Sequence, residues 1–197
     1  MNWVFLGMIG FFGGLIFGSF FEHAFHRYFL HSTPKSLRKS KYVRTMFEGH
    51  VVSHHANYMP DDHYTQDKTN HEKVLTFKWY EGPLIILLLS SFIYGVVSLI
   101  KMILGLSVNL FMPEVIGASI AFAIYYTAYE TLHVLMHVPG KWKWLRDTKF
   151  MTWLNRHHNQ HHGDPRTNLN VIFPLADYVQ GTKKKLPKEQ YIYADKL

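Results

Sequence analysis

Residues 3–31 read WVFLGMIGFFGGLIFGSFFEHAFHRYFLH, an apolar run that leads without a break into His26 and His31. Residues 3–21 carry no charge, and a helix of this length, at about 1.5 Å per residue, nearly spans the roughly 30 Å hydrocarbon core of a bilayer. Two further apolar runs cover residues 84–104 and 115–132. We therefore predict an all-α integral membrane protein with three spanning helices, in which a cytoplasmic helical cap completes a single domain over residues 1–197.

The positive charges fall on one side of these predicted spans. If the amino terminus lies outside, residues 22–83 and 133–197 are cytoplasmic, and they contain every Lys and Arg except Lys101. This distribution agrees with the positive-inside rule. The formal net charge of +7 is then explained by membrane orientation, and we expect no nucleic-acid partner. The pattern fits a bacterial inner membrane and an endoplasmic reticulum equally well.

The first apolar run is not expected to be a cleaved signal peptide, because it has neither a basic amino-terminal region nor a small-residue cleavage site. The chain contains no cysteine. Disulfides, thiolate-ligated haem and cysteine-ligated iron–sulfur clusters are therefore excluded.

Histidine is the residue type that points to chemistry. Ten of the fourteen histidines fall into four short clusters, all on the predicted cytoplasmic side. Imidazole is the commonest metal-ligating side chain and suits iron, zinc, copper or nickel. Since one metal rarely takes more than roughly six protein ligands, ten candidates predict two metals in one site. The clusters are His26 and His31; His50, His54 and His55; His133 and His137; and His158, His161 and His162.

Two of the four clusters have α-helical spacing. His133 and His137 are four residues apart and share one helix face, and the last cluster, at i, i+3 and i+4, can point at one site. His157 lies about 90° from the centre of that face. We therefore leave it out of the predicted ligand set.

The other two clusters fit an α-helix less well. The five-residue spacing of His26 and His31, repeated in His50 and His55, spreads the side chains by about 140° on an ideal α-helix. Both pairs need a helix end or a bend to converge. Helical geometry alone would instead favour His23 together with His26.

Carboxylates are a minor feature of the pattern. Soluble di-iron proteins place a Glu-x-x-His motif on each of two helices, and this chain has only one match, Glu130 to His133. We predict instead that Glu22, Glu130 and Asp164 orient imidazole N–H groups. Capping or surface roles for these three residues are equally open.

The ordered clusters resemble a known family. The strings His26-Arg-Tyr-Phe-Leu-His31, His50-x-x-x-His54-His55, His133-x-x-x-His137 and His158-x-x-His161-His162 are similar to those of the fatty acid hydroxylase and sterol desaturase superfamily. So is the stretch from Arg156 through Asp164-Pro165-Arg166 to Asn170-Val-x-Phe-Pro-Leu-Ala-Asp177 and Gly181-Thr182. The resemblance covers roughly residues 20–182.

The resemblance implies a di-iron centre held by all ten clustered histidines, with zinc as a substitute that purified protein could carry. It implies that Asn170 and Asp177 lie near the site. The implied reaction uses O2 and two electrons from a separate ferredoxin or cytochrome b5-like donor to hydroxylate a fatty acyl, sphingolipid or sterol-like lipid taken from the bilayer. Desaturation is the alternative outcome. The family's common form has four membrane helices, and residues 141–155 could supply the fourth.

Two other kinds of metal protein remain to be weighed. A membrane haem-b protein needs single histidines deep inside facing helices, and a metal transporter needs ligands along the bilayer interior. Neither need is met by histidines clustered at the ends of apolar runs. Separately, Gly10, Gly14 and Gly18 form a small-residue stripe suited to close helix contact, through which an oligomer could form.

Overall fold

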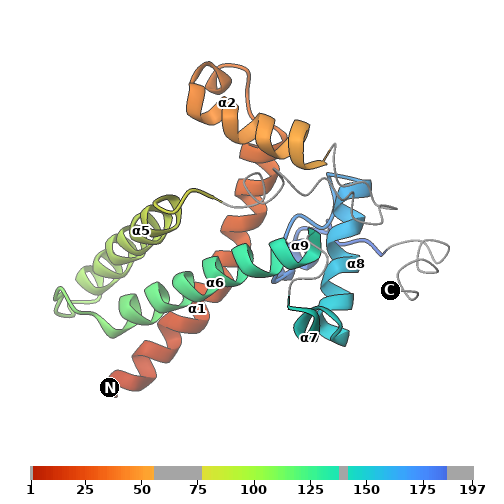
Figure 1. Ribbon diagram of the computed structural model, residues 1–197. Helices are drawn as coiled ribbons and strands as arrows, with labels where there is room; N and C mark the ends of the chain where they lie inside the picture. Colours follow the sequence, from red (N-terminus) through yellow and green to blue (C-terminus); the bar gives the residue numbers. More distant parts are fainter. Residues whose placement is uncertain (1, 56–76, 138–141, 186–197) are drawn as a thin grey trace. The chain divides into compact units, whose positions relative to one another are not determined.

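The computed structural model describes residues 2–55, 77–137 and 142–185 (Figure 1). All regular structure within these ranges is helical, which confirms the all-α prediction. The elements in chain order are α1 (Trp3–Phe25), η1 (His26–His31), η2 (Leu37–Lys39), α2 (Lys41–Phe47), η3 (Glu48–His54), α5 (Glu81–Ile103), α6 (Pro113–His137), α7 (Lys143–Arg146), α8 (Lys149–Gly163) and α9 (Leu175–Val179).

The chain divides into two compact units. The first unit contains Met1–Gly18 and Phe77–Ala128, and the second contains Ser19–Thr76 and Tyr129–Leu197. The first unit therefore holds α5 and the amino-terminal parts of α1 and α6. The second unit holds the remaining parts of those two helices and all the shorter elements, including every described histidine.

Close helix contact organises the first unit. A Cβ added at Gly10 would lie 1.9 Å from the Glu114 carbonyl oxygen of α6, and one at Gly14 would lie 2.9 Å from the Cα of Ala118. The glycine stripe therefore lets α1 approach α6 within the chain, while an oligomer through the same residues stays a prediction. Near the carboxyl end of α5, the Lys101 ammonium lies 3.0 Å from the Glu114 carboxylate.

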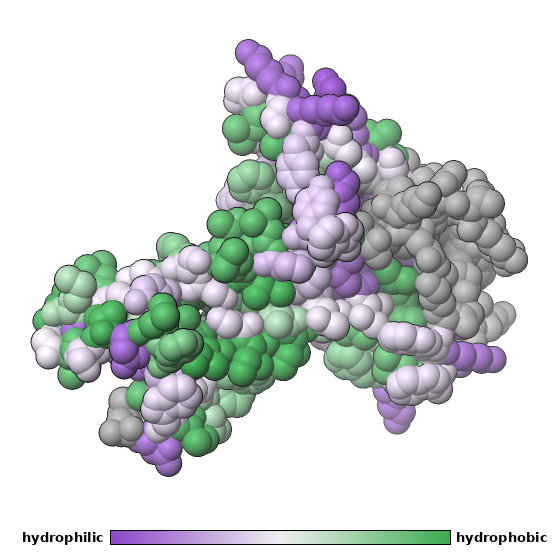
Figure 2. All heavy atoms as spheres, turned by 60° about the vertical axis from the view of Figure 1, so that its left-hand side comes forward, coloured by the Kyte–Doolittle hydropathy of each residue, from purple (hydrophilic) through white to green (hydrophobic). Residues whose placement is uncertain are grey.

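Two of the described helices are long and apolar enough to cross a membrane: the continuous helix Trp3–His31 and Glu81–Ile103. Their large side chains are mostly exposed, as at Phe5, Leu87 and Leu99. Hydrophobic residues accordingly cover a large part of the face shown in Figure 2. The third predicted span is helical, within α6, but α6 does not meet the same criterion, so the number of spans and their orientation stay predictions.

The second unit has its own apolar core. The buried side chains of Leu135 and Met136 from α6 pack with Met151 and Leu154 from α8 and with Val171 from the segment that follows. Helix α8 begins where the Thr148 hydroxyl accepts a hydrogen bond from the backbone N–H of Met151 at 3.2 Å, an N-cap that satisfies one free amide. Within residues 142–155 the structure has the short helix α7 and most of α8, and a fourth span stays a prediction.

The contact between α1 and α6 gives a testable prediction. Gly10→Ala should destabilise the protein by about 1–3 kcal/mol, because the new methyl group meets backbone that cannot move aside cheaply. Gly13→Ala is the matched control on the same helix, since a Cβ there meets nothing within 4 Å. It should be neutral or slightly stabilising, because alanine favours helix over glycine by about 1 kcal/mol. Thermal unfolding of both variants tests this, and equal melting temperatures would contradict it.

Candidate metal centre

The ten clustered histidines converge in the second unit. Their ring nitrogens form groups in which the potential ligand atoms all lie within 4.8 Å of one another. There are three such groups among the described residues, and we name them the five-histidine group, the four-histidine group and the joining group, because the last shares His54 with the four-histidine group and His55 with the five-histidine group. The five-histidine group is His26, His31, His50, His55 and His161; the four-histidine group is His54, His133, His137 and His158; and the joining group is His54, His55 and His162.

Two π-helical turns bring together the histidines that are five residues apart. In a π-helix the hydrogen bond runs from i to i+5, so residues five apart come nearly into line. His26 and His31 are the first and last residues of η1. In the second turn, the backbone N–H of His55 donates to the carbonyl of His50 itself. The predicted helix end or bend is therefore a local widening of each helix. It brings His26 and His31, and likewise His50 and His55, into the five-histidine group.

The α-helices α6 and α8 supply the other histidines. His133 and His137 lie one turn apart on α6 and both belong to the four-histidine group. Helix α8 serves both groups, because His158 belongs to the four-histidine group, His161 to the five-histidine group and His162 to the joining group. The three histidines of α8 therefore do not share a single group, although each of them belongs to one of the three groups.

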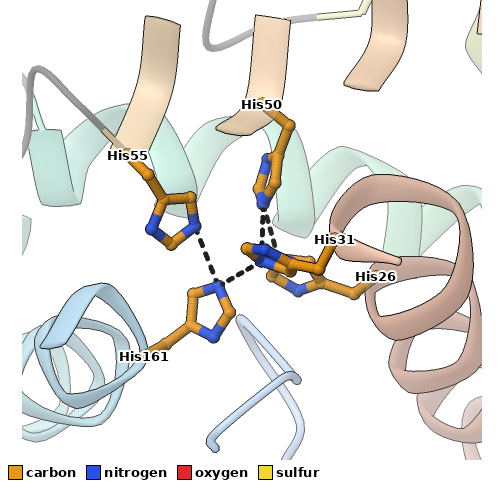
Figure 3. Close-up of side chains that lie close together, drawn as sticks. All are labelled: His26, His31, His50, His55 and His161. Carbon is orange, nitrogen blue, oxygen red and sulfur yellow. Dashed lines mark hydrogen bonds between the residues drawn. The ribbon is translucent and has the colours of Figure 1, made fainter. Parts of the chain in front are cut away.

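The spacing of the rings matches a metal coordination shell. Figure 3 shows the five-histidine group with its rings directed at one another from η1, from η3 and its carboxyl end, and from α8. The Nε2 atoms of His26 and His50 are 2.9 Å apart, those of His31 and His50 3.1 Å, and those of His31 and His161 3.0 Å. With a metal–nitrogen distance of about 2.1 Å, neighbouring ligands lie about 3.0 Å apart in an octahedron and about 3.4 Å apart in a tetrahedron. The observed separations are close to those between neighbouring ligands of one metal ion.

The four-histidine group has similar spacing. The Nε2 atoms of His137 and His158 lie 2.8 Å apart. The Nε2 of His162 lies 3.1 Å from that of His158. Since His162 also belongs to the group with His54 and His55, the two sets of ligands adjoin each other.

Backbone carbonyls fix the tautomers of two histidines. Because a carbonyl oxygen only accepts hydrogen bonds, the Nδ1 of His26 must donate to Leu169 and the Nδ1 of His161 must donate to Thr167, the latter at 2.9 Å. Each neutral ring then has an unprotonated Nε2 that faces the five-histidine group. A metal-ligating histidine typically has this arrangement.

Hydrogen bonding alone does not satisfy the five-histidine group. Four Nε2–Nε2 contacts link its members in one series. A neutral Nε2 either donates one hydrogen or accepts through one lone pair, so at most two of the four contacts can be ordinary hydrogen bonds. A cation that binds the lone pairs accounts for all four contacts. The residues present therefore fit a metal ion. The series runs His26, His50, His31, His161, His55.

Burial keeps these imidazoles neutral. Burial, followed by repulsion from neighbouring imidazoles, holds the pKa values of His50, His54 and His158 well below the ordinary value. The pKa of His161 is lowered in the same way, although its hydrogen bond to the Thr167 carbonyl opposes the shift. Neutral imidazole is the form that binds metal, so this environment favours ligation.

The two other buried histidines lie outside the groups. The Nε2 of His157 is 3.3 Å from the Asp177 carboxylate, consistent with its exclusion from the ligand set. The Nε2 of His23 is 3.0 Å from the Thr182 hydroxyl and 3.7 Å from Asp177. It is His31 and not His23 that joins His26 in the five-histidine group.

The predicted orienting residues occupy different places. Asp164 bonds Arg166 and Lys184 at the end of α8, and Glu130 is half-buried on α6. Glu22 and Asp177 are buried in the second unit and accept hydrogen bonds from backbone amides of the segment Thr167–Val171, to which the buried Asn170 belongs. The groups that accept from His26 and His161 are backbone carbonyls of that segment. A backbone acceptor has no residue signature, so sequence analysis missed both.

Comparison with models of protein families, with curated proteins and with solved structures finds no match to this chain.

Acid should destabilise the metal-free protein. The pKa values of His50, His54, His158 and His161 are lowered in the fold, so below about pH 6.5 the unfolded chain binds more protons than the folded chain. The stability is complete above that pH and is lost as the pH falls, at up to about 1.4 kcal/mol per pH unit for each histidine. The melting temperature of chelator-treated protein should therefore fall between about pH 7 and pH 5. His158→Gln should flatten the dependence, and a constant melting temperature would contradict this interpretation.

Metal content should report on the two groups separately. We expect two divalent ions per chain, of which His161→Ala and His133→Ala each lose or weaken one, because each variant removes a ligand from a different group. His157→Gln, which changes a buried histidine of the same helix outside the groups, should keep both. Elemental analysis after dialysis measures the content. Retention of two ions by His161→Ala would remove the ligand assignment.

Proposed function

We propose that the chain is a membrane-bound di-iron oxygenase that hydroxylates a lipid, with O2 as co-substrate and two electrons from a separate donor. The observation that carries the proposal is the convergence of ten histidines on the five-histidine group, the four-histidine group and the group that joins them. The close resemblance of their order along the chain to the fatty acid hydroxylase and sterol desaturase superfamily supports the same reaction.

The donor set favours iron as the metal. Structural zinc sites are almost always four-coordinate and tetrahedral, whereas the five-histidine group offers five imidazoles, more than a tetrahedral site takes. Iron suits imidazole ligands and retains open positions for O2 in non-haem oxygenases. When bound, two irons would supply the activation of O2 that attack on an aliphatic C–H bond requires.

The chain's own residues provide a dry and rigid site for that chemistry. His54, His158 and His161 are at most 1% exposed, so little water reaches the ligands, and water exclusion protects a reactive centre from side reactions. The hydrogen bonds of His26 and His161 to backbone carbonyls fix their rings. The site is therefore organised before substrate arrives.

The lipid substrate is inferred from the helix that leads into the site. Trp3–His31 is one continuous helix, long and apolar enough to cross a membrane, and its last residues are ligands of the five-histidine group. A substrate whose tail dissolves in the bilayer would thus be presented beside the metal ligands. The basic residues of the predicted cytoplasmic segments are a plausible docking surface for an acidic electron donor.

Two other functions, lipid desaturation and metal transport, can be distinguished by the lipid analysis described below. Desaturation would use the same centre and would remove two hydrogens in place of adding oxygen. A metal transporter needs ligands that release their ion, and four or five imidazoles around each site, most of them buried, favour retention.

Lipid analysis of cells that express the protein tests the function. Cells with the wild type should contain a lipid with one added oxygen that is missing from cells with His161→Ala, because that variant loses a metal ligand. His63→Ala, which changes a histidine of no predicted cluster, should keep the product. Untargeted mass spectrometry measures the lipids.

A wild-type-specific lipid that lacks two hydrogens would assign desaturation instead. Wild-type protein that binds no iron would remove the oxygenase proposal. Iron-loaded protein without any new lipid, even with an added ferredoxin and reductase, would favour the metal-binding alternative.

A further inference from the structure

The segment Thr167–Val171, between α8 and α9, has no regular structure yet is fully enclosed. Asn168, Leu169, Asn170 and Val171 are each 0% exposed. Buried backbone without a helix or a sheet must find hydrogen-bond partners elsewhere. Where those partners lie shows what the segment does.

On one side the segment faces the metal ligands. The carbonyl of Leu169 accepts from the Nδ1 of His26, and the carbonyl of Thr167 accepts from the Nδ1 of His161. Both rings belong to the five-histidine group. The position of this backbone therefore decides where two ligands point.

On its other side the segment is held by two buried carboxylates. Asp177 of α9 accepts from the backbone N–H of Leu169 at 2.8 Å and of Asn170 at 2.9 Å. Glu22 of α1 accepts from the backbone N–H of Val171 at 2.7 Å. Three consecutive amides are thus bound to carboxylate oxygens, and charge-assisted bonds of this kind are about twice as strong as neutral ones.

One peptide group connects Asp177 directly to His26. The Leu169 carbonyl and the Asn170 N–H belong to the same peptide bond, so the N–H bonds the Asp177 carboxylate while the carbonyl accepts from His26. Hydrogen bonds in series polarise one another. A negative charge on the N–H side makes the carbonyl a stronger acceptor, which holds the proton on Nδ1 and makes the Nε2 of His26 a better ligand.

The corresponding peptide behind His161 has a neutral partner. The Thr167 carbonyl shares its peptide bond with the Asn168 N–H, which donates to the Thr182 carbonyl at 3.1 Å. His161 is therefore oriented by the same segment without a carboxylate behind it. This difference singles out Asp177.

We propose that Asp177 is a positioning residue for the five-histidine group, which acts on His26 through the Leu169–Asn170 peptide bond. The role rests on the proposed metal centre, and it extends that centre to a residue that touches no ligand ring. It is distinct from the direct pairing of carboxylate with imidazole that the sequence suggested.

Binding of Co2+ to the purified full-length protein tests the role, because imidazole sites accept several divalent metals and Co2+ is visible by absorption. Asp177→Asn removes the charge and leaves an amide group facing a backbone N–H. We expect one of the two Co2+ ions to bind about 10–100-fold more weakly, the usual effect of losing an outer hydrogen-bond partner. The visible spectrum of that ion should also change.

Two variants separate positioning from general loss of structure. Glu22→Gln removes the other buried carboxylate from the same segment, but Glu22 accepts from the Val171 amide and the Asn170 side chain, and not from the backbone N–H of Asn170. Asp164→Asn removes a partly exposed carboxylate that bonds Arg166 and Lys184. Asp164→Asn should bind two Co2+ ions within about twofold of wild-type affinity, and Glu22→Gln should weaken binding clearly less than Asp177→Asn, whatever their melting temperatures. If Glu22→Gln weakened one ion as much as Asp177→Asn, the specific role of Asp177 would be overturned.

A measurement on the wild type keeps the proposal testable even if Asp177→Asn does not fold. In metal-free protein labelled with ¹⁵N-histidine, NMR should show His26, assigned by its loss in His26→Gln, as the Nδ1–H tautomer. An Nε2–H tautomer would overturn the proposal. Wild-type protein that binds no Co2+ would overturn the metal centre and this role together. Two bound ions with an unaffected Asp177→Asn would overturn the role alone.

Discussion

The close packing of imidazole nitrogens against one another is the constraint on which the second unit depends. In the five-histidine group, Nε2 atoms about 3 Å apart in mostly buried rings leave lone pairs that hydrogen bonds within the group cannot all satisfy. Burying polar atoms without partners is costly. A fold that gathers ten such rings from four clusters along the chain would be stabilised by cations bound to them, so we expect metal binding and folding to be linked.

Convergence of this kind limits the local structure of each contributing element. Residues on an α-helix share a face at spacings of three or four, which the histidines of α6 and α8 have. The pairs spaced by five instead lie on π-helical turns, η1 and η3, where the wider turn restores alignment. Such turns are rare and concentrate at functional sites. In this protein the π-helical turns have a direct role, because each of them brings two histidines into the five-histidine group.

Much of this arrangement could be predicted from the sequence. Apolar runs predicted the long helices, and the grouping of His133 with His137 followed from α-helical spacing. The alignment of His26 with His31 could not be derived from the sequence. Residues five apart do not share a face of an α-helix, and no residue pattern here predicts a π-helical turn. The division of α8 between two groups was missed for a related reason: i, i+3 and i+4 lie on one face, yet they spread enough for His158 and His161 to serve neighbouring centres.

The placement of the carboxylates follows from electrostatics. Buried cations need nearby negative charge, yet all the ligands in the described groups are neutral imidazoles. Burial tends to raise the pKa of Asp177, but its hydrogen bonds from His157, Thr182 and the backbone amides outweigh that effect and hold the pKa below the ordinary value, so the carboxylate is ionised. In the proposed centre one peptide bond separates Asp177 from His26. The charge would strengthen the orienting carbonyl, while His26 remains a neutral imidazole whose Nε2 lone pair faces the five-histidine group.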